Sequence, residues 1–206
     1  NLFIYFVVRD ETYIYYVLYI SGFMSWLATY YGYCFQYLWP DSPGLGNQVI
    51  LLTSAAWFIC MIHFVSSFLD TKRTVPWFEK LKKALIIFVS IFVILSFFDL
   101  YRSLIIVIVS FGISSSIICL VVAYICFNMG LRQAKYFLLA WTTFLVSLTI
   151  FSLKIVDIFP SIIVVEKSIQ IGSVLEVMLL SLGLADRINL LKREKMLAQE
   201  ASIRAS

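Results

Sequence analysis

Six long apolar runs alternate with short polar segments along this chain of 206 residues. The hydrocarbon core of a bilayer is about 30 Å thick, and a helix needs roughly 20 apolar residues to cross it. The runs are of about this length, and polar residues are sparse inside them. The pattern predicts an all-α, polytopic transmembrane helix bundle with spans at residues 12–31, 49–69, 84–98, 103–127, 136–155 and 161–184.

The composition excludes a soluble domain. Hydrophobic residues make up 62% of the chain and charged residues only 14%, and a soluble fold of this length has too little interior to bury so much apolar surface. The runs are also longer than the roughly 10 residues of a barrel strand and lack its strict alternation. Because every backbone N–H in lipid needs an internal partner, the spans are expected to be helices.

Residues 1–8 are apolar but too few to cross a bilayer, since they would rise only about 12 Å as a helix. We interpret them as the cytoplasmic end of a first helix whose front half is missing. With that helix the complete bundle has seven crossings. The chain is then expected to be a piece of a larger protein.

The basic residues predict the orientation of the bundle. Of the 16 Lys and Arg residues, all but Arg102, Lys154 and Lys167 fall on alternate loops. The positive-inside bias places that majority in the cytoplasm, and the C-terminus with it, in a multi-pass protein of the inner membrane. The net charge of +4 therefore indicates contact with membrane lipid, and no nucleic-acid partner is expected.

Aromatic residues gather near the first complete span, with several Tyr residues inside it and others at its outer end. Tyr and Trp side chains are enriched at membrane interfaces, which is where we expect these rings to lie. The outer segment that follows, residues 32–48, contains two Pro and three Gly. These residues predict a folded turn rather than a helix.

The last span continues into polar sequence without a Gly or Pro that would end it. Beyond residue 187 apolar residues recur at helical spacing, which is typical of a helix that becomes a coiled coil. We therefore divide the chain into a bundle, residues 1–187, and the start of a cytoplasmic stalk, residues 188–206, leading to an output domain outside this sequence. Asp186, Arg187 and Asn189 mark the junction, and a paired stalk implies a homodimer.

Two ionisable residues lie deep inside the spans. Glu176 is about halfway along the last span, where a lone charge costs several kcal/mol, and Ser173 and Gln170 precede it. His63 is the only histidine and lies at a similar predicted depth. We expect Glu176, His63, Gln170 and Ser173 to be candidates for signal transmission, with a hydrogen bond between Glu176 and His63. The alternative for each residue is a polar group that merely joins helices.

The sequence contains no arrangement of residues typical of an enzyme. It has one His, no pair of carboxylates at one depth, no glycine-rich phosphate loop and no cluster of metal ligands. No catalytic residue, cofactor or metal is predicted for this chain.

The chain resembles the membrane domain of bacterial seven-transmembrane receptors with diverse intracellular signalling modules. The resemblance rests on residues 13–19 (YIYYVLY), 35–40 (FQYLWP), 136–141 (YFLLAW), 170–176 (QIGSVLE) and 180–189 (LSLGLADRIN). It implies an extracytoplasmic sensor domain before the bundle and a cytoplasmic kinase, cyclase or phosphatase after it. Gly183 departs from the family pattern, in which Ala is expected.

These observations favour a receptor module that transmits an outer signal to a cytoplasmic output domain. A small transporter or channel is the alternative, although no span has an interior Pro and no internal repeat is visible. A membrane-embedded hydrolase is a third possibility, but it would need a nucleophile or metal cluster that the sequence does not contain.

Overall fold

A computed structural model describes residue 5 and residues 9–41, 43–98, 101–155, 160 and 162–205. Every regular element within these residues is a helix, which confirms the predicted all-α class. The truncated first helix predicted for residues 1–8 lies, apart from Tyr5, outside the described residues. The chain divides into two compact units, residues 1–122 and 123–206, and each unit is described by itself.

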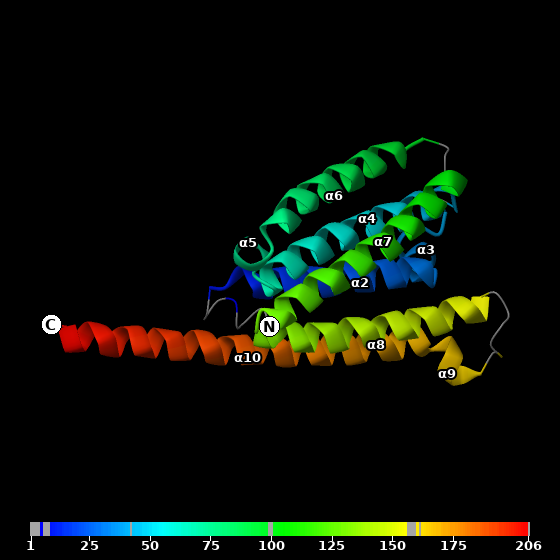
Figure 1. Cartoon of the computed structure of the whole chain (residues 1–206). Coiled ribbons are helices and arrows are strands. Elements are labelled where there is room, and N and C mark those ends of the chain that lie inside the picture. Colours follow the sequence, from blue (N-terminus) through cyan, green and yellow to red (C-terminus); the bar gives the residue numbers. More distant parts are fainter. Residues whose placement is uncertain are drawn as a thin grey trace. The chain divides into compact units, whose positions relative to one another are not determined.

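Two long helices, α2 (Glu11–Tyr30) and α4 (Pro43–Phe68), lie side by side in the first unit (Figure 1). Between them along the chain is the short helix α3 (Tyr33–Leu38). The one-turn helix α5 (Thr71–Thr74) then leads into α6 (Pro76–Leu95), which also packs against α4. This unit therefore has α4 at its centre.

The helix boundaries in the first unit follow from local chemistry. Asp10 caps α2, because its carboxylate accepts a hydrogen bond of 2.9 Å from the backbone N–H of Thr12. Pro76 occupies the first turn of α6, where the N–H that proline lacks would have no helical partner. Asp70, between α4 and α5, has a left-handed backbone with φ of 46°. Asp tolerates this conformation better than most residues, so the chain can reverse there.

Aromatic side chains form the contact between α2 and α4. Tyr13, Tyr16 and Tyr19 are completely or almost completely buried, and the ring of Tyr19 stacks on Phe64 with centroids 5.5 Å apart. Burying three large rings against α4 stabilises the helix pair, and the expectation that these tyrosines lie at the level of a membrane interface stays a prediction. Gly22 allows the close approach, since a β-carbon there would lie 3.1 Å from the Cα of Trp57.

The long helix α7 (Tyr101–Asn128) begins in the first unit and ends in the second. Gly112 lies against the ring of Phe58 on α4, which leaves little space for a larger side chain. The second unit continues with α8 (Arg132–Ile155), the four-residue α9 (Ile163–Glu166) and α10 (Ser168–Ala205). α8 and α10 run antiparallel and side by side (Figure 1).

Four helices of the described residues are long and apolar enough to cross a membrane. They are α4, α7, α8 and α10, with candidate spans at Leu45–Phe68, Ser103–Asn128, Arg132–Phe151 and Ser168–Leu190. Four of the six predicted spans are therefore present as helices of sufficient length and hydropathy. α2 and α6 do not meet these limits, because α2 is rich in hydroxyl groups and α6 begins with several charged residues. The count of seven crossings stays a prediction.

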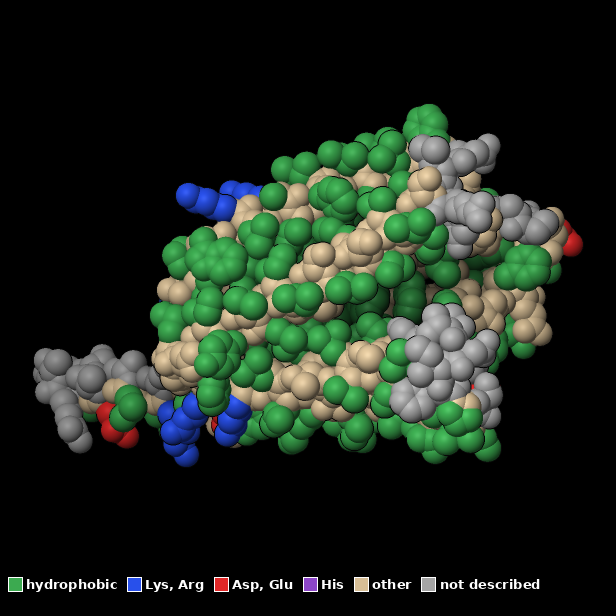
Figure 2. All heavy atoms as spheres, turned by 45° about the vertical axis from the view of Figure 1, so that its right-hand side comes forward, with side chains coloured by type: hydrophobic (Ala, Val, Ile, Leu, Met, Phe, Trp, Pro, Cys, Tyr) green, Lys and Arg blue, Asp and Glu red, His purple; other side chains and the backbone are tan. Residues whose placement is uncertain are grey.

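Apolar side chains cover the surface of the helices in place of the polar shell of a soluble protein. Figure 2 shows hydrophobic side chains over most of the face in view, while Lys and Arg gather toward helix ends. On α7, large exposed residues recur at helical spacing at Ile106, Val109, Ile113 and Ile117. An apolar face of this size needs lipid or another helix to cover it, so the chain is a multi-pass membrane protein.

The prediction of a turn for residues 32–48 was wrong in part. Residues 33–38 form α3, and α4 begins at Pro43 rather than near residue 49. Both proline positions are compatible with this arrangement: Pro40 follows α3, and Pro43 occupies the first turn of α4, where proline is tolerated.

Candidate functional site

The second unit brings α8 and α10 into very close contact beside the predicted transmission residues. Gly172 of α10 lies directly against Ser147 of α8: a β-carbon at position 172 would overlap the side chain of Ser147. Both helices rise about 1.5 Å per residue, so in this antiparallel pair Glu176 lies about level with Thr143. By the same register, Arg187 lies about level with Arg132, the first residue of α8.

Glu176 follows Gly172 by one helical turn on α10, and only 1% of its surface is exposed. Ser173, one turn before it, is also buried and donates a hydrogen bond of 2.9 Å to the backbone carbonyl of Gln170. Gln170 is half-buried. Three of the four predicted transmission residues therefore lie on one helix within two turns. A buried carboxyl in a membrane protein is costly to ionise, which makes Glu176 sensitive to any change in how α8 and α10 pack.

His63, the fourth predicted transmission residue, belongs to the first unit. It is half-buried on α4, and its ring stacks on Tyr15 of α2 with centroids 5.4 Å apart. Because Glu176 lies in the second unit, the predicted hydrogen bond between them stays a prediction. The contact with Tyr15 gives His63 a packing role within its own unit.

The predicted junction residues lie on an unbroken helix. Asp186 and Arg187 are half-buried and Asn189 is exposed, and α10 continues from Ser168 to Ala205. Beyond the level of Arg187 it extends past the beginning of α8 (Figure 1). The pairing of this extension into a coiled coil, and the division of the chain at residue 187, stay predictions.

A polar cluster at the junction of α4, α5 and α6 is absent from the sequence prediction. Its centre is the carboxylate of Glu79, which receives hydrogen bonds of 2.6 Å each from the hydroxyls of Ser66 and Thr71. The ammonium of Lys82 lies 2.6 Å from the other oxygen of the same carboxylate and donates to the Ser66 hydroxyl at 2.8 Å. One carboxylate thus joins three helices.

This cluster lies before the predicted span of α6, and its electrostatics favour a charged Glu79. Burial raises the pKa of the Glu79 carboxyl, but the hydrogen bonds from Lys82, Ser66 and Thr71 and the charge of Lys82 outweigh burial, and the pKa falls from 4.5 to about 2. Only 11% of the Lys82 side chain and 21% of the Glu79 side chain are exposed. The pair is a shielded structural ion pair.

A second polar contact joins α2 to the same end of α4. The Thr12 hydroxyl lies 2.8 Å from the Ser67 hydroxyl and donates a hydrogen bond of 2.7 Å to the Asp10 carboxylate. Two adjacent serines of α4, Ser66 and Ser67, therefore hold α6 and α2 respectively. The spacing of three between Glu79 and Lys82 was the only signal of this cluster in the sequence.

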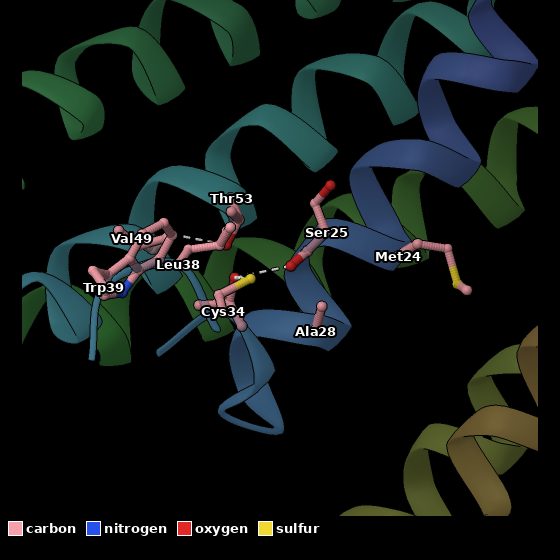
Figure 3. A pocket seen from close by; sticks show the side chains of 9 residues that line it. Met24, Ser25, Ala28, Cys34, Leu38, Trp39, Val49 and Thr53 are labelled. Atoms are coloured by element: carbon pink, nitrogen blue, oxygen red, sulfur yellow. Dashed lines mark hydrogen bonds between the residues drawn. The ribbon is translucent and has the colours of Figure 1, made fainter. Parts of the chain in front are cut away.

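An open pocket of about 440 Å³ lies near the opposite end of α2 and α4, where α2, α3 and α4 each contribute side chains (Figure 3). None of its described lining residues is charged, and Met24 and Leu38 are among them. The hydroxyls of Ser25, Thr29 and Thr53 each donate to a carbonyl of their own helix, at 2.8, 2.9 and 2.8 Å. The pocket thus has no charged group among its described lining residues, and these three hydroxyls are already bonded within their own helices.

Comparison with known proteins identifies one family. The family model described as "7TM diverse intracellular signalling" matches residues 1–187. No curated protein and no solved structure matches the chain. The matched region covers the first unit and the second unit as far as Arg187.

Proposed function

On the premise that the chain belongs to the 7TM diverse intracellular signalling family, we propose that it transmits an extracytoplasmic signal to a cytoplasmic output domain. The output domain is a kinase, cyclase or phosphatase, and the sensor is an N-terminal extracytoplasmic domain of the same protein. The chain itself is not an enzyme. It lies in the inner membrane with its C-terminus in the cytoplasm, as the distribution of basic residues indicates.

The single observation that supports this proposal most is the geometry of α10. The same unbroken helix packs on α8, carries the buried Glu176 and extends past the beginning of α8. A change in the packing of α8 on α10 therefore moves the extension as one body. A coupling free energy of about 1–3 kcal/mol between two packing arrangements is sufficient for such a switch.

The alternative of a transporter receives no support from the helices described. Transporters often have spans broken near the middle of the membrane, whereas α4, α7, α8 and α10 each run unbroken through their candidate spans. Signalling through a paired α10 extension also explains why the helix continues so far beyond its apolar part. The functional unit that we propose is a homodimer.

The proposal is tested by fusing the α10 extension to a reporter histidine kinase and comparing variants in cells. Glu176→Gln removes the ionisable carboxyl from the interface and is expected to change basal or stimulated kinase output several-fold. Glu200→Gln is the matched control, because it makes the same substitution at an exposed position of the same helix. Equal output from wild type and Glu176→Gln would contradict the role of Glu176.

A further inference from the structure

We propose that the corner formed by α5 and the start of α6 binds the phosphate headgroups of anionic phospholipids. The surface consists of the cations of Lys72, Arg73, Lys80 and Lys83 beside the indole ring of Trp77, and we call it the basic corner. All four cations are exposed, and Trp77 is 48% exposed. The proposal concerns lipid recognition and does not depend on the signalling function or the orientation.

The exposed face of α6 changes its chemistry along the helix. It begins with Trp77 and Lys80 and continues at helical spacing through Ala84 to Ile87 and Ile91, both more than half exposed. Trp and Lys are typical of the headgroup region, and exposed Ile is typical of the hydrocarbon region. The change between residues 80 and 84 therefore places the basic corner at the level of the lipid phosphates.

The shielded ion pair decides which cations face the lipid. Lys82 lies on the inner side of α6, where Glu79 neutralises it at 2.6 Å. Lys80 and Lys83, on either side of it, are exposed. Asp70 is 3.7 Å from Arg73, but the Arg73 side chain remains 87% exposed, so this surface contact leaves its guanidinium accessible.

The polar cluster also holds α5 in place. Thr71 is fully buried, and its hydroxyl donates a hydrogen bond to the Glu79 carboxylate. The Thr74 hydroxyl donates a hydrogen bond of 3.0 Å to the backbone carbonyl of Asp70. The two residues between these anchors are Lys72 and Arg73. Their backbone is thus fixed before lipid binds, so little conformational entropy is lost on binding. Charged headgroups attract such cations in proportion to their number near the surface.

The experiment measures lipid retained by the full chain, using native mass spectrometry after extraction from bilayers of equal phosphatidylglycerol and phosphatidylcholine. Wild type is expected to retain the anionic lipid at least tenfold more than the zwitterionic one. The variant Lys72→Gln/Arg73→Gln/Lys80→Gln/Lys83→Gln is expected to lose most of this preference. The matched control, Arg132→Gln/Lys135→Gln/Lys192→Gln/Arg193→Gln, removes the same charge from the second unit and is expected to keep it.

A twofold variant and a competition with inorganic phosphate complete the test of the basic corner. If the fourfold variant does not fold, Lys80→Gln/Lys83→Gln replaces it and is expected to reduce the preference at least threefold. Inorganic phosphate at the same concentration is expected not to displace the lipid, because it lacks the acyl chains that lie along α6. Equal loss in both fourfold variants, no loss in the basic-corner variants, or displacement by free phosphate would each overturn the proposal.

Discussion

Gly172 and Ser147 form the closest approach between α8 and α10, because position 172 has no space for a β-carbon beside the Ser147 side chain. Small residues at such positions let helices in membranes pack tightly enough for dispersion forces to hold them. The contact lies one turn from Glu176, so it also fixes how deeply that carboxyl is enclosed.

Substitution of Gly172 is expected to destabilise the second unit. Gly172→Ala would force α8 and α10 apart, and overpacking of this kind costs about 1–3 kcal/mol. A lower unfolding temperature of the purified protein in detergent micelles measures the effect. Gly46→Ala on α4 is the matched control, because no atom lies within 4 Å of a β-carbon there, and its unfolding temperature should be close to that of wild type.

The same prediction has a second test in a double variant. Ser147→Gly removes the side chain that a residue at 172 would meet, so Ser147→Gly/Gly172→Ala is expected to regain most of the stability lost in Gly172→Ala. If the double variant is as unstable as the sum of its single substitutions, the two residues are not coupled in the way the geometry requires.

The polar cluster predicts a specific dependence of stability on pH. The pKa of Glu79 is lower in the folded chain, about 2, than its ordinary value of 4.5. Its contribution to folding is therefore complete above about pH 4.5 and is lost as the pH falls toward 2. The difference in unfolding temperature between wild type and Glu79→Gln should be large at pH 6 and should shrink between pH 4.5 and pH 2.

The control for this measurement is Glu200→Gln, which removes an exposed carboxylate from the α10 extension. It should unfold at the same temperature as wild type throughout the range. An advantage of wild type over Glu79→Gln that stays constant between pH 6 and pH 2 would show that the charge of Glu79 does not stabilise the cluster.

The orientation can be tested by labelling single cysteines on intact cells with a reagent that does not cross membranes. Tyr37 of α3 and Lys192 of α10 are both exposed, and Cys34→Ser removes the native thiol near Tyr37. In that background Tyr37→Cys should be labelled and Lys192→Cys should not. Labelling of Lys192→Cys after the cells are permeabilised is the control for accessibility. Equal labelling of Tyr37→Cys and Lys192→Cys on intact cells would contradict the orientation.

The long apolar helices could be predicted from the sequence because hydropathy and length alone determine them. α4 and α10 are the clearest cases. The start of α4 was placed too late, since Pro43 was considered a helix breaker although proline is favoured in a first turn. The buried positions of Tyr13 and Tyr16 could not be predicted, because they depend on the rings that α4 presents and not on the preference of tyrosine for interfaces.

The polar cluster was missed for a different reason. Glu79 on α6 accepts hydrogen bonds from Ser66 on α4 and Thr71 on α5. These contacts depend on how the chain reverses between the helices, and no periodic pattern in the sequence indicates contacts of that kind. The burial of Glu176 is consistent with the small residues near it in the sequence, because such residues mark the face of a membrane helix that packs on other helices.

The continuity of α10 has a geometric consequence for whatever follows it. In an α-helix each residue turns the chain by about 100°, so one residue inserted after Asn189 would rotate everything beyond it by that angle about the helix axis. Insertions of seven residues restore nearly the original direction, whereas insertions of one or two do not. The phase of this helix, as much as its length, therefore decides which side of a following domain faces its neighbour.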